Sequence, residues 1–194
     1  MMTYSGLNLE IKLKKINPKD HRYIEILYNW NSNENQFEYF TCRPIHEYLN
    51  FEEYITSITK HIRNGVQFYV LKSINDKNTN IYGEISMFDY NPRNHSAEFG
   101  YYLPKQNRGK GLGRVMINLF LDLIFKDKDL NLHKIYATTA SCNTPSIRLL
   151  EQFDFCLDGK LRDHYWIGNN KQDQFHYSLL KEEWDEKTRR PNCI

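Results

Sequence analysis

The stretch SAEFGYYLPKQNRGKGLGR, residues 96–114, decides the fold that we predict for this chain. Residues 96–103 are rich in aromatic side chains and read as a strand. A basic turn with three glycines follows, and apolar residues then recur at helical spacing from Leu112 to Ile124. Glycine amides and the unpaired N–H groups of a first helical turn can both approach an anion. The succession of strand, turn and helix therefore predicts a site for a phosphate-bearing ligand.

The spacing of the glycines excludes two common phosphate motifs. The pattern GxxxxGK[ST] is absent, and in GxGxxG the third glycine would fall on Arg114. What is left is Q-x-x-G-x-G, followed by a further glycine and Arg114. The polar, basic and glycine residues of this turn are Gln106, Arg108, Gly109, Lys110, Gly111, Gly113 and Arg114. A flexible, solvated basic loop is the alternative interpretation of the same residues.

The remaining segments predict a single domain of mixed α/β (α+β) class. Period-2 or β-branched runs indicate strands at 7–16, 66–73, 81–90, 96–103, 131–139, 155–157, 165–167 and 175–180. Helical spacing indicates helices after Pro18, after Asn50, from Leu112 and after Thr144, which we expect to be an N-cap. Because hairpins alternate with crossover helices, we expect a mostly antiparallel mixed sheet flanked by helices.

Two segments are predicted to lack regular structure. The first helix should end in a loop at residues 31–33, Asn-Ser-Asn. Residues 181–194 are charged and read as a frayed C-terminal tail, which leaves a domain at 1–180.

Composition narrows the class of protein. The chain has 194 residues, 40% of them hydrophobic and 26% charged, which is a globular balance. A net charge of +2 gives no support to a nucleic-acid or membrane partner. The N-terminus lacks the apolar core of a signal peptide, and no apolar run is long enough to span a membrane. The cysteines form no CxxC pair, so we expect reduced thiols in a cytoplasmic protein without a metal site: Cys42, Cys142, Cys156 and Cys193.

These motifs together resemble the GNAT family of N-acetyltransferases, whose acetyl-CoA motif is [QR]-x-x-G-x-[GA]. The strand SAEFGYYL resembles the central strand of that family. Residues 143–155, NTPSIRLLEQFDF, are similar to its segment N-x-x-[SA]-x-x-L-[YL]-x-x-x-G-F. Residues 131–136 and 158–162 resemble the branch that contains ribosomal-protein N-terminal and spermidine acetyltransferases. The resemblance extends over residues 7–180.

The resemblance implies that acetyl-CoA is the acetyl donor and that no metal is needed. Turn residues would surround the pyrophosphate, the strand before them would pair with the pantetheine arm, and Asn143 would hydrogen-bond that arm. The implied cofactor residues are Tyr101, Tyr102, Leu103, Gln106, Arg108, Gly109, Lys110, Gly111, Leu112, Gly113, Arg114, Asn143 and Ser146. A turn-former before a helix is the alternative reading of Asn143.

Transfer to an amine also requires a proton acceptor. An ammonium group with a pKa of about 10.4 must lose a proton before it attacks a thioester. Alternation places Glu98 on the opposite strand face from Ala97 and Phe99, and the resemblance puts an acidic residue there. We therefore predict Glu98 as the general base, acting through water. A Glu paired with a cation on an open sheet face is the alternative.

The proton donor for the leaving thiolate is less clearly marked. Many relatives place a Tyr where this chain has Leu150. Ser141 is our predicted catalytic substitute, with Tyr136, Tyr165 or no donor as alternatives. A catalytically idle CoA-binding or regulatory module is the competing function, because Leu150 departs from the pattern.

The acceptor is predicted to be a protein N-terminal amine or a small amine such as a polyamine or amino sugar. Arg43 stands where an acidic pair would suit a polyamine. No nucleic-acid or membrane partner is expected, and the sequence leaves homodimerisation open.

Overall fold

The computed structural model describes residues 2–4, 9–35, 37–41, 43–74 and 80–189. The chain groups into two compact units that interleave along the sequence. The first unit comprises Met1–Phe37, Pro44–Phe88 and Gly100–Phe120, and the second comprises Glu38–Arg43, Asp89–Phe99 and Leu121–Ile194.

The first unit contains an antiparallel run of strands. In order across the sheet they are β1 (Met2–Tyr4), β2 (Leu9–Lys15), β3 (Gln67–Ser73) and β4 (Ile81–Asn91), whose last residues belong to the second unit. Both the β2 strand and the antiparallel pairing of β3 with β4 confirm the sequence predictions. The polar segment 75–80, which we expect to link these two strands, lies outside the described residues except for Asn80.

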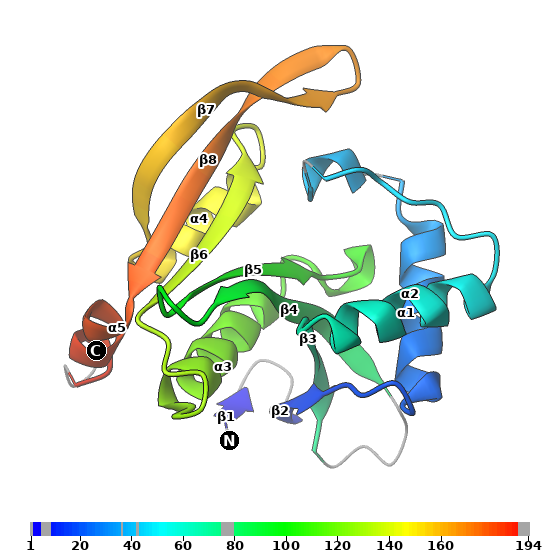
Figure 1. Ribbon diagram of the computed structural model, residues 1–194, viewed down its shortest axis with the longest axis horizontal. Helices are drawn as coiled ribbons and strands as arrows, with labels where there is room; N and C mark the ends of the chain where they lie inside the picture. Colours follow the sequence, from blue (N-terminus) through cyan, green and yellow to red (C-terminus); the bar gives the residue numbers. More distant parts are fainter. Residues whose placement is uncertain (1, 5–8, 36, 42, 75–79, 190–194) are drawn as a thin grey trace. The chain divides into compact units, whose positions relative to one another are not determined.

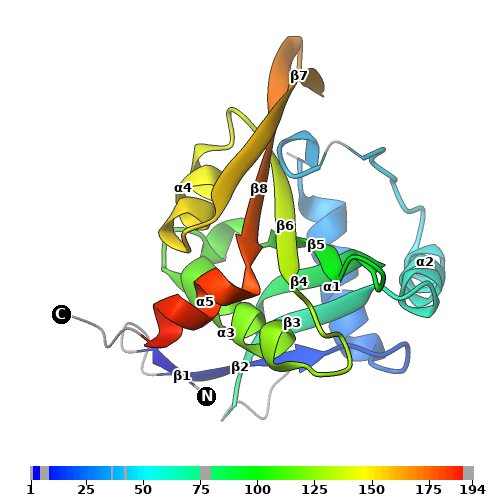
Figure 2. The same cartoon turned by 60° about the vertical axis from the view of Figure 1, so that its left-hand side comes forward.

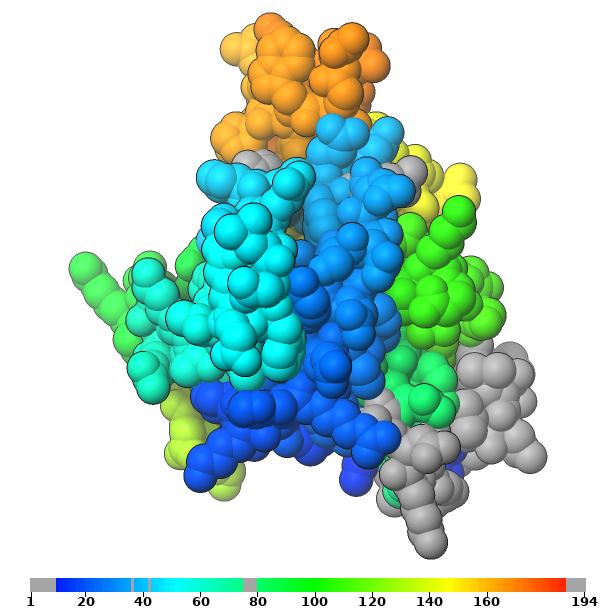
Figure 3. All heavy atoms as spheres, turned by 90° about the vertical axis from the view of Figure 1, so that its right-hand side faces the viewer, coloured from blue at the N-terminus to red at the C-terminus, as the bar shows by residue number. Residues whose placement is uncertain are grey.

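Two helices cover one face of these strands. Helices α1 (His21–Asn33) and α2 (Phe51–Arg63) lie side by side (Figure 1), and Figure 3 shows their outer surface, α1 in blue and α2 in cyan. Their buried side chains form one apolar cluster with the strands, including Ile24, Ile58 and Val70. Burial of each such side chain stabilises the fold by about 1.5 to 3 kcal/mol. The Asn50 side chain caps α2 by accepting a hydrogen bond from the Glu53 amide at 2.9 Å.

Helix α3 (Leu112–Lys126) begins in the first unit and packs there against β3 and β4. The rings of Tyr69 and Phe120 meet edge to face, with centroids 5.9 Å apart. Gly83 on β4 leaves no room for a side chain. A Cβ there would stand 2.6 Å from the Leu103 Cδ2 atom and 3.1 Å from both the Met116 sulfur and the Tyr102 carbonyl oxygen.

The second unit holds the remaining strands and a short helical turn. The strand order is β5 (Ser96–Tyr102), β6 (Lys134–Ala140), β8 (Asn170–Leu180) and β7 (Cys156–Ile167). β5 runs parallel to β6 over Ser96–Glu98, and the other pairs are antiparallel. β5 continues into the first unit from Gly100. The 3-10 turn η1 (Phe37–Tyr39) overlaps the segment Glu38–Arg43, which belongs to the second unit.

One face of this part of the sheet is covered and the other carries polar side chains. Helices α4 (Thr144–Gln152) and α5 (Lys181–Arg189) lie on the same side of β6 and β8 (Figure 2). Ile135 and Ala137 of β6 are buried, whereas Lys134, Tyr136 and Thr138 alternate with them and point to the opposite face.

The predicted fold class is confirmed: a mixed, mostly antiparallel sheet is flanked by helices. The predicted loop at residues 31–33 is wrong, because α1 continues to Asn33. There the side chains of Ser32 and Asn33 donate hydrogen bonds to the carbonyls of Tyr28 and Asn29, one turn back.

Three further predictions need correction. The N-cap of α4 is Asn143, not Thr144. The runs 155–157 and 165–167 belong largely to one long strand, β7, whose pairing with β8 shifts register twice and so disrupts the apolar alternation. The expected tail is helical over Lys181–Arg189, because Trp184 is buried and packs against Phe153. Residues 190–194 lie outside the described residues.

Cys142 and Cys156 are free thiols, as expected. The predictions for Cys42 and Cys193 fall outside the described part of the chain. None of the helices in the described residues has the length and apolar character needed to cross a bilayer. Likewise, those residues contain no cluster of three or more His, Cys, Asp or Glu side chains suited to a metal ion.

Candidate functional site

The glycine-rich turn connects β5 to α3 within the first unit. After a short 3-10 turn, η2 (Lys105–Asn107), the chain passes through Gly109 and Gly111 at φ values of 71° and 75°. These left-handed conformations suit glycine, because a Cβ would crowd the following carbonyl oxygen. Helix α3 begins directly after the turn, at Leu112, and the first N–H groups of the helix lack intrahelical partners. Such a helix start favours an anion.

Arg108 braces the turn from inside. Its Nε donates to the Leu103 carbonyl oxygen at 2.8 Å, and its Nη2 donates to Glu34 Oε2 at 2.6 Å. The Tyr102 hydroxyl donates to the same Glu34 oxygen at 2.9 Å. Burial and this hydrogen bond to Glu34 raise the pKa of Tyr102 to about 12. Asn107 adds a hydrogen bond to the Tyr82 carbonyl at 2.8 Å.

The structure therefore gives the predicted cofactor residues of the turn three different environments. Arg108 is committed to Glu34 and to the turn itself, and sequence reasoning did not identify this pairing. Gln106, Lys110 and Arg114 have exposed side chains. Leu112 and Gly113 are buried at the start of α3. Exposed basic side chains beside left-handed glycines at a helix start fit a pyrophosphate ligand.

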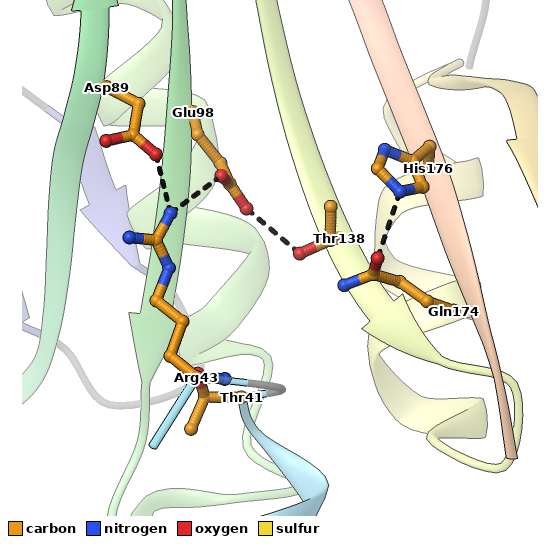
Figure 4. A network of polar contacts seen from close by, with 7 residues as sticks. All are labelled: Thr41, Arg43, Asp89, Glu98, Thr138, Gln174 and His176. Carbon is orange, nitrogen blue, oxygen red and sulfur yellow. Dashed lines mark hydrogen bonds and ion pairs between the residues drawn. The ribbon is translucent and has the colours of Figure 1, made fainter. Parts of the chain in front are cut away.

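Glu98 lies at the centre of a polar network in the second unit (Figure 4). Its Oε1 accepts a hydrogen bond from the Thr138 hydroxyl at 2.9 Å, and its Oε2 accepts one from Arg43 Nη2 at 3.2 Å. The same Arg43 nitrogen donates to Asp89 Oδ2 at 2.6 Å. Only 11% of the Glu98 side chain is exposed, compared with about half of the Arg43 and Asp89 side chains. Glu98 is thus the fixed member of the network.

The network also affects neighbouring groups. Burial alone would lower the pKa of Arg43, but hydrogen bonds and charges from Asp89 and Glu98 outweigh burial and raise it. Burial, followed by the negative charges of Glu98 and Asp89, raises the pKa of Tyr136. Arg43 therefore stays a cation, and Tyr136 stays a neutral hydroxyl at physiological pH.

Sequence reasoning did not identify the partners of Glu98. Strand alternation places Thr138 on the same face as Tyr136, and the register pairs Tyr136 with Glu98. That signal becomes available only once the pairing of β5 with β6 is known. Nothing in the sequence around Arg43 or Asp89 indicates a contact with Glu98, because the contact joins distant segments.

The other predicted site residues have local structural partners. Asn143 caps α4 by accepting a hydrogen bond from the Ser146 amide at 3.3 Å, and its Nδ2 donates to the Tyr39 carbonyl at 3.1 Å. The Ser141 hydroxyl donates to Gln172 at 3.1 Å and accepts from the Asp173 amide at 3.2 Å. Ser141 therefore bonds to residues outside the network in Figure 4. Tyr101 and Tyr102 end β5, and Leu103 follows them.

Comparison with known proteins agrees with this geometry. The family model described as "Acetyltransferase (GNAT) domain" matches residues 11–156. The spermidine N(1)-acetyltransferase of Vibrio cholerae serotype O1 is 29% identical over 178 residues, which cover 92% of this chain and 97% of that protein. YdaF of Bacillus subtilis (strain 168), named as a ribosomal N-acetyltransferase, is 26% identical over 182 residues, covering 92% and 96%.

A solved structure supports the same conclusion. The spermidine N-acetyltransferase from Vibrio cholerae, crystallised in complex with CoA and spermine, matches with a TM-score of 0.76 and 27% identity, covering 90% of this chain and 97% of that one. The predicted resemblance is confirmed, and with it the enzyme class. The chain belongs to the GNAT family of N-acetyltransferases.

Proposed function

We propose that this protein transfers the acetyl group of acetyl-CoA directly to a primary amine. The observation that carries the proposal is the pair of left-handed glycines, Gly109 and Gly111, placed directly before α3 within the family's acetyl-CoA motif. A relative of known structure binds CoA, which supports the same donor here.

Within the turn, the backbone amides near Gly109 and Gly111 would hold the pyrophosphate, and the exposed side chains of Gln106, Lys110 and Arg114 would surround it. Arg108 would act indirectly, by holding the turn in shape through Glu34. The backbone of residues 101–103 would pair with the pantetheine arm. Asn143 would hydrogen-bond that arm, and Ser146 would lie near it.

Glu98 is the proposed general base. Its carboxylate would take one proton from the acceptor ammonium, directly or through water, leaving a neutral amine and a protonated carboxyl group. Acetyl-CoA would supply a thioester carbon to which the amine nitrogen bonds. The carbon–sulfur bond then breaks, CoA leaves as the thiolate, and the nitrogen releases its second proton to solvent as the amide forms. The hydrogen bond from Thr138 orients the Glu98 carboxylate for this task.

The proton returned to the CoA sulfur needs a separate source. Leu150, at the position of the family's usual Tyr, is fully buried. We keep Ser141 as the proposed donor. Its hydroxyl donates to Gln172, so it would have to change partner to act. An unchanged kcat in Ser141→Ala would eliminate this role.

The proposed acceptor is a protein N-terminal amine or a small amine such as a polyamine or an amino sugar. Spermidine acetyltransferases and a ribosomal acetyltransferase are both among the relatives, so relatedness does not choose between these classes. Self-association is also a proposal here, supported by a relative whose structure is described as dodecameric. Light scattering of the purified protein tests it.

The function is tested by cofactor binding and turnover together. Acetyl-CoA at about 100 times its Kd should stabilise the fold by about 2.7 kcal/mol and raise the melting temperature accordingly. A panel of spermidine, amino sugars and short peptides should then release free CoA thiol. Absence of a thermal shift at millimolar acetyl-CoA would refute the cofactor assignment.

A second candidate function is a catalytically idle CoA-binding or regulatory module. It is favoured by the buried Leu150, which stands at the position of the family's usual Tyr. This module would show the same thermal shift but release no CoA with any amine. Robust turnover with one acceptor would eliminate it.

A further inference from the structure

The contact between Arg43, Asp89 and Glu98 has the geometry of an occupied cation site. A single guanidinium nitrogen, Nη2 of Arg43, lies 2.6 Å from Asp89 Oδ2 and 3.2 Å from Glu98 Oε2. A primary ammonium between two carboxylates makes contacts of the same length and charge. Figure 4 shows the two carboxylates converging on that one nitrogen.

The three side chains differ in how firmly they are held. Thr138 anchors the nearly buried Glu98 from the neighbouring strand. Asp89 has a φ of 51°, an uncommon conformation for a residue with a side chain, in the last part of β4. Arg43 comes from a segment outside the sheet, and 54% of its side chain is exposed. Because exposed ion pairs are worth little, the guanidinium is the member that a competing cation would displace.

The surface beside this contact has room for the rest of an acceptor. An open hollow of about 560 Å³ lies on the polar face of the second unit's strands. Tyr136, the register partner of Glu98 on β6, lines it. Lys134 and Asp158 also line the hollow and pair with each other at 2.6 Å. The hollow therefore extends along the sheet as far as Tyr136, which lies beside Glu98.

We propose that Arg43 occupies the ammonium position of the acceptor site, and that an acceptor amine binds between Asp89 and Glu98 by displacing it. The acceptor's body would then extend over Tyr136 into the hollow. This inference rests on the proposed function for its acceptor, although the cation site itself does not. Arg43 is a specificity-determining residue in this scheme, since only an amine that competes with a guanidinium gains access to Glu98.

The first test needs no turnover. Arg43→Ala and Arg43→Gln proteins are titrated with methylguanidinium chloride against equal sodium chloride, and the melting temperature is followed. A saturable rise in both variants, absent from the wild type and from Arg43→Ala/Asp89→Asn, is expected. The absence of any rise in either single variant would overturn the cation site, whether or not the protein acetylates amines.

The second test uses turnover with n-butylamine, spermidine and an alanyl tripeptide. In Arg43→Ala, the KM of the amine should fall about three- to tenfold, the range expected for loss of a partly exposed competing ion pair, with the KM of acetyl-CoA unchanged. Methylguanidinium should inhibit this variant competitively against the amine. Arg93→Ala is the matched control, because Arg93 is an exposed arginine of the same unit and should leave the KM of the amine unchanged.

A fall in kcat with unchanged KM in Arg43→Ala would make Arg43 a positioning residue for Glu98 and refute its displacement. A general failure of CoA release with every amine would instead count against the proposed function. In that case the methylguanidinium titration alone decides the cation site.

Discussion

The glycine-rich turn and the Glu98 network are built in opposite ways. The turn depends on backbone conformation within one short segment, from Leu103 to the start of α3, and its glycines have the conformation that the motif requires. The network depends on side chains from four separate segments, contributed by Arg43, Asp89, Glu98 and Thr138. The backbone conformation of the turn is local, although Arg108 and Asn107 also bond to the distant residues Glu34 and Tyr82. The Glu98 network is wholly tertiary.

This difference separates two sets of expected effects. Changes in the turn should alter cofactor binding and the cost of forming the turn. Changes in the network should alter proton transfer and acceptor binding while cofactor binding persists. A network variant that weakens cofactor binding, or a turn variant that weakens acceptor binding, would contradict this separation.

Glu98→Gln should have the largest effect. The amide keeps the shape of the side chain but cannot take a proton, so kcat should fall about 10²- to 10⁴-fold, with the KM of acetyl-CoA retained. Thr138→Val is the control, because it removes one hydrogen bond and leaves the carboxylate in place. Its loss should be smaller. A kcat of Glu98→Gln equal to that of the wild type would make Glu98 structural.

Glu84 on β4 is a contrasting carboxyl group in the first unit. Within the described residues it has no hydrogen bond or ion pair, and burial raises its pKa to about 7. Since the ordinary pKa of this carboxyl group is 4.5, Glu84 ionises at lower pH in the unfolded chain than in the folded protein. Stability is therefore lost between about pH 4.5 and 7, and the loss is complete above the folded-state pKa.

Glu84→Gln removes this penalty. The variant should gain stability relative to the wild type as pH rises from 5 to 8, by about 1 to 3 kcal/mol at the upper end because Glu84 is only half-buried. Urea unfolding at both pH values measures the gain. Glu25→Gln, on the exposed face of α1, should show no such trend. Equal stability differences at pH 5 and 8 would disprove the pKa assignment.

Gly109→Ala tests the turn directly. A left-handed conformation costs an alanine about 1 to 2 kcal/mol, and the added methyl group also stands where an anion would approach. Gly65→Ala is a closely matched control, because both glycines have positive φ and open space around the added Cβ. Both variants should lose similar stability in thermal unfolding. Only Gly109→Ala should raise the KM of acetyl-CoA, and a similar rise in both would contradict the cofactor role.

Asn143→Ala should have the smallest effect. Loss of an N-cap costs about 1 kcal/mol, and Asn143→Ala also loses the hydrogen bond to the Tyr39 carbonyl, so it should be destabilised at least as much as Asn50→Ala. If Asn143 also holds the pantetheine arm, only its replacement should weaken acetyl-CoA binding in calorimetry. Unchanged affinity would leave Asn143 with its structural contacts alone.

The same contrast explains which features could be predicted from the sequence. The strand, turn and first part of α3 follow from local patterns, and so do the caps at Asn50 and Gly65. The environment of Glu98 does not, because Arg43 and Asp89 reach it only through the tertiary fold. Local patterns also failed where packing overrides composition, as at Trp184, whose burial stabilises a helix in a charged segment.

The central claim is direct transfer of acetyl from acetyl-CoA to an amine by this chain. Its most direct test measures, in one reaction, the amide formed by mass spectrometry and the CoA thiol released. Direct transfer predicts one amide for each thiol with the wild type, and near-complete loss of both in Glu98→Gln while acetyl-CoA still binds. Acetyl-CoA binding without amide formation for any amine in the panel would contradict it.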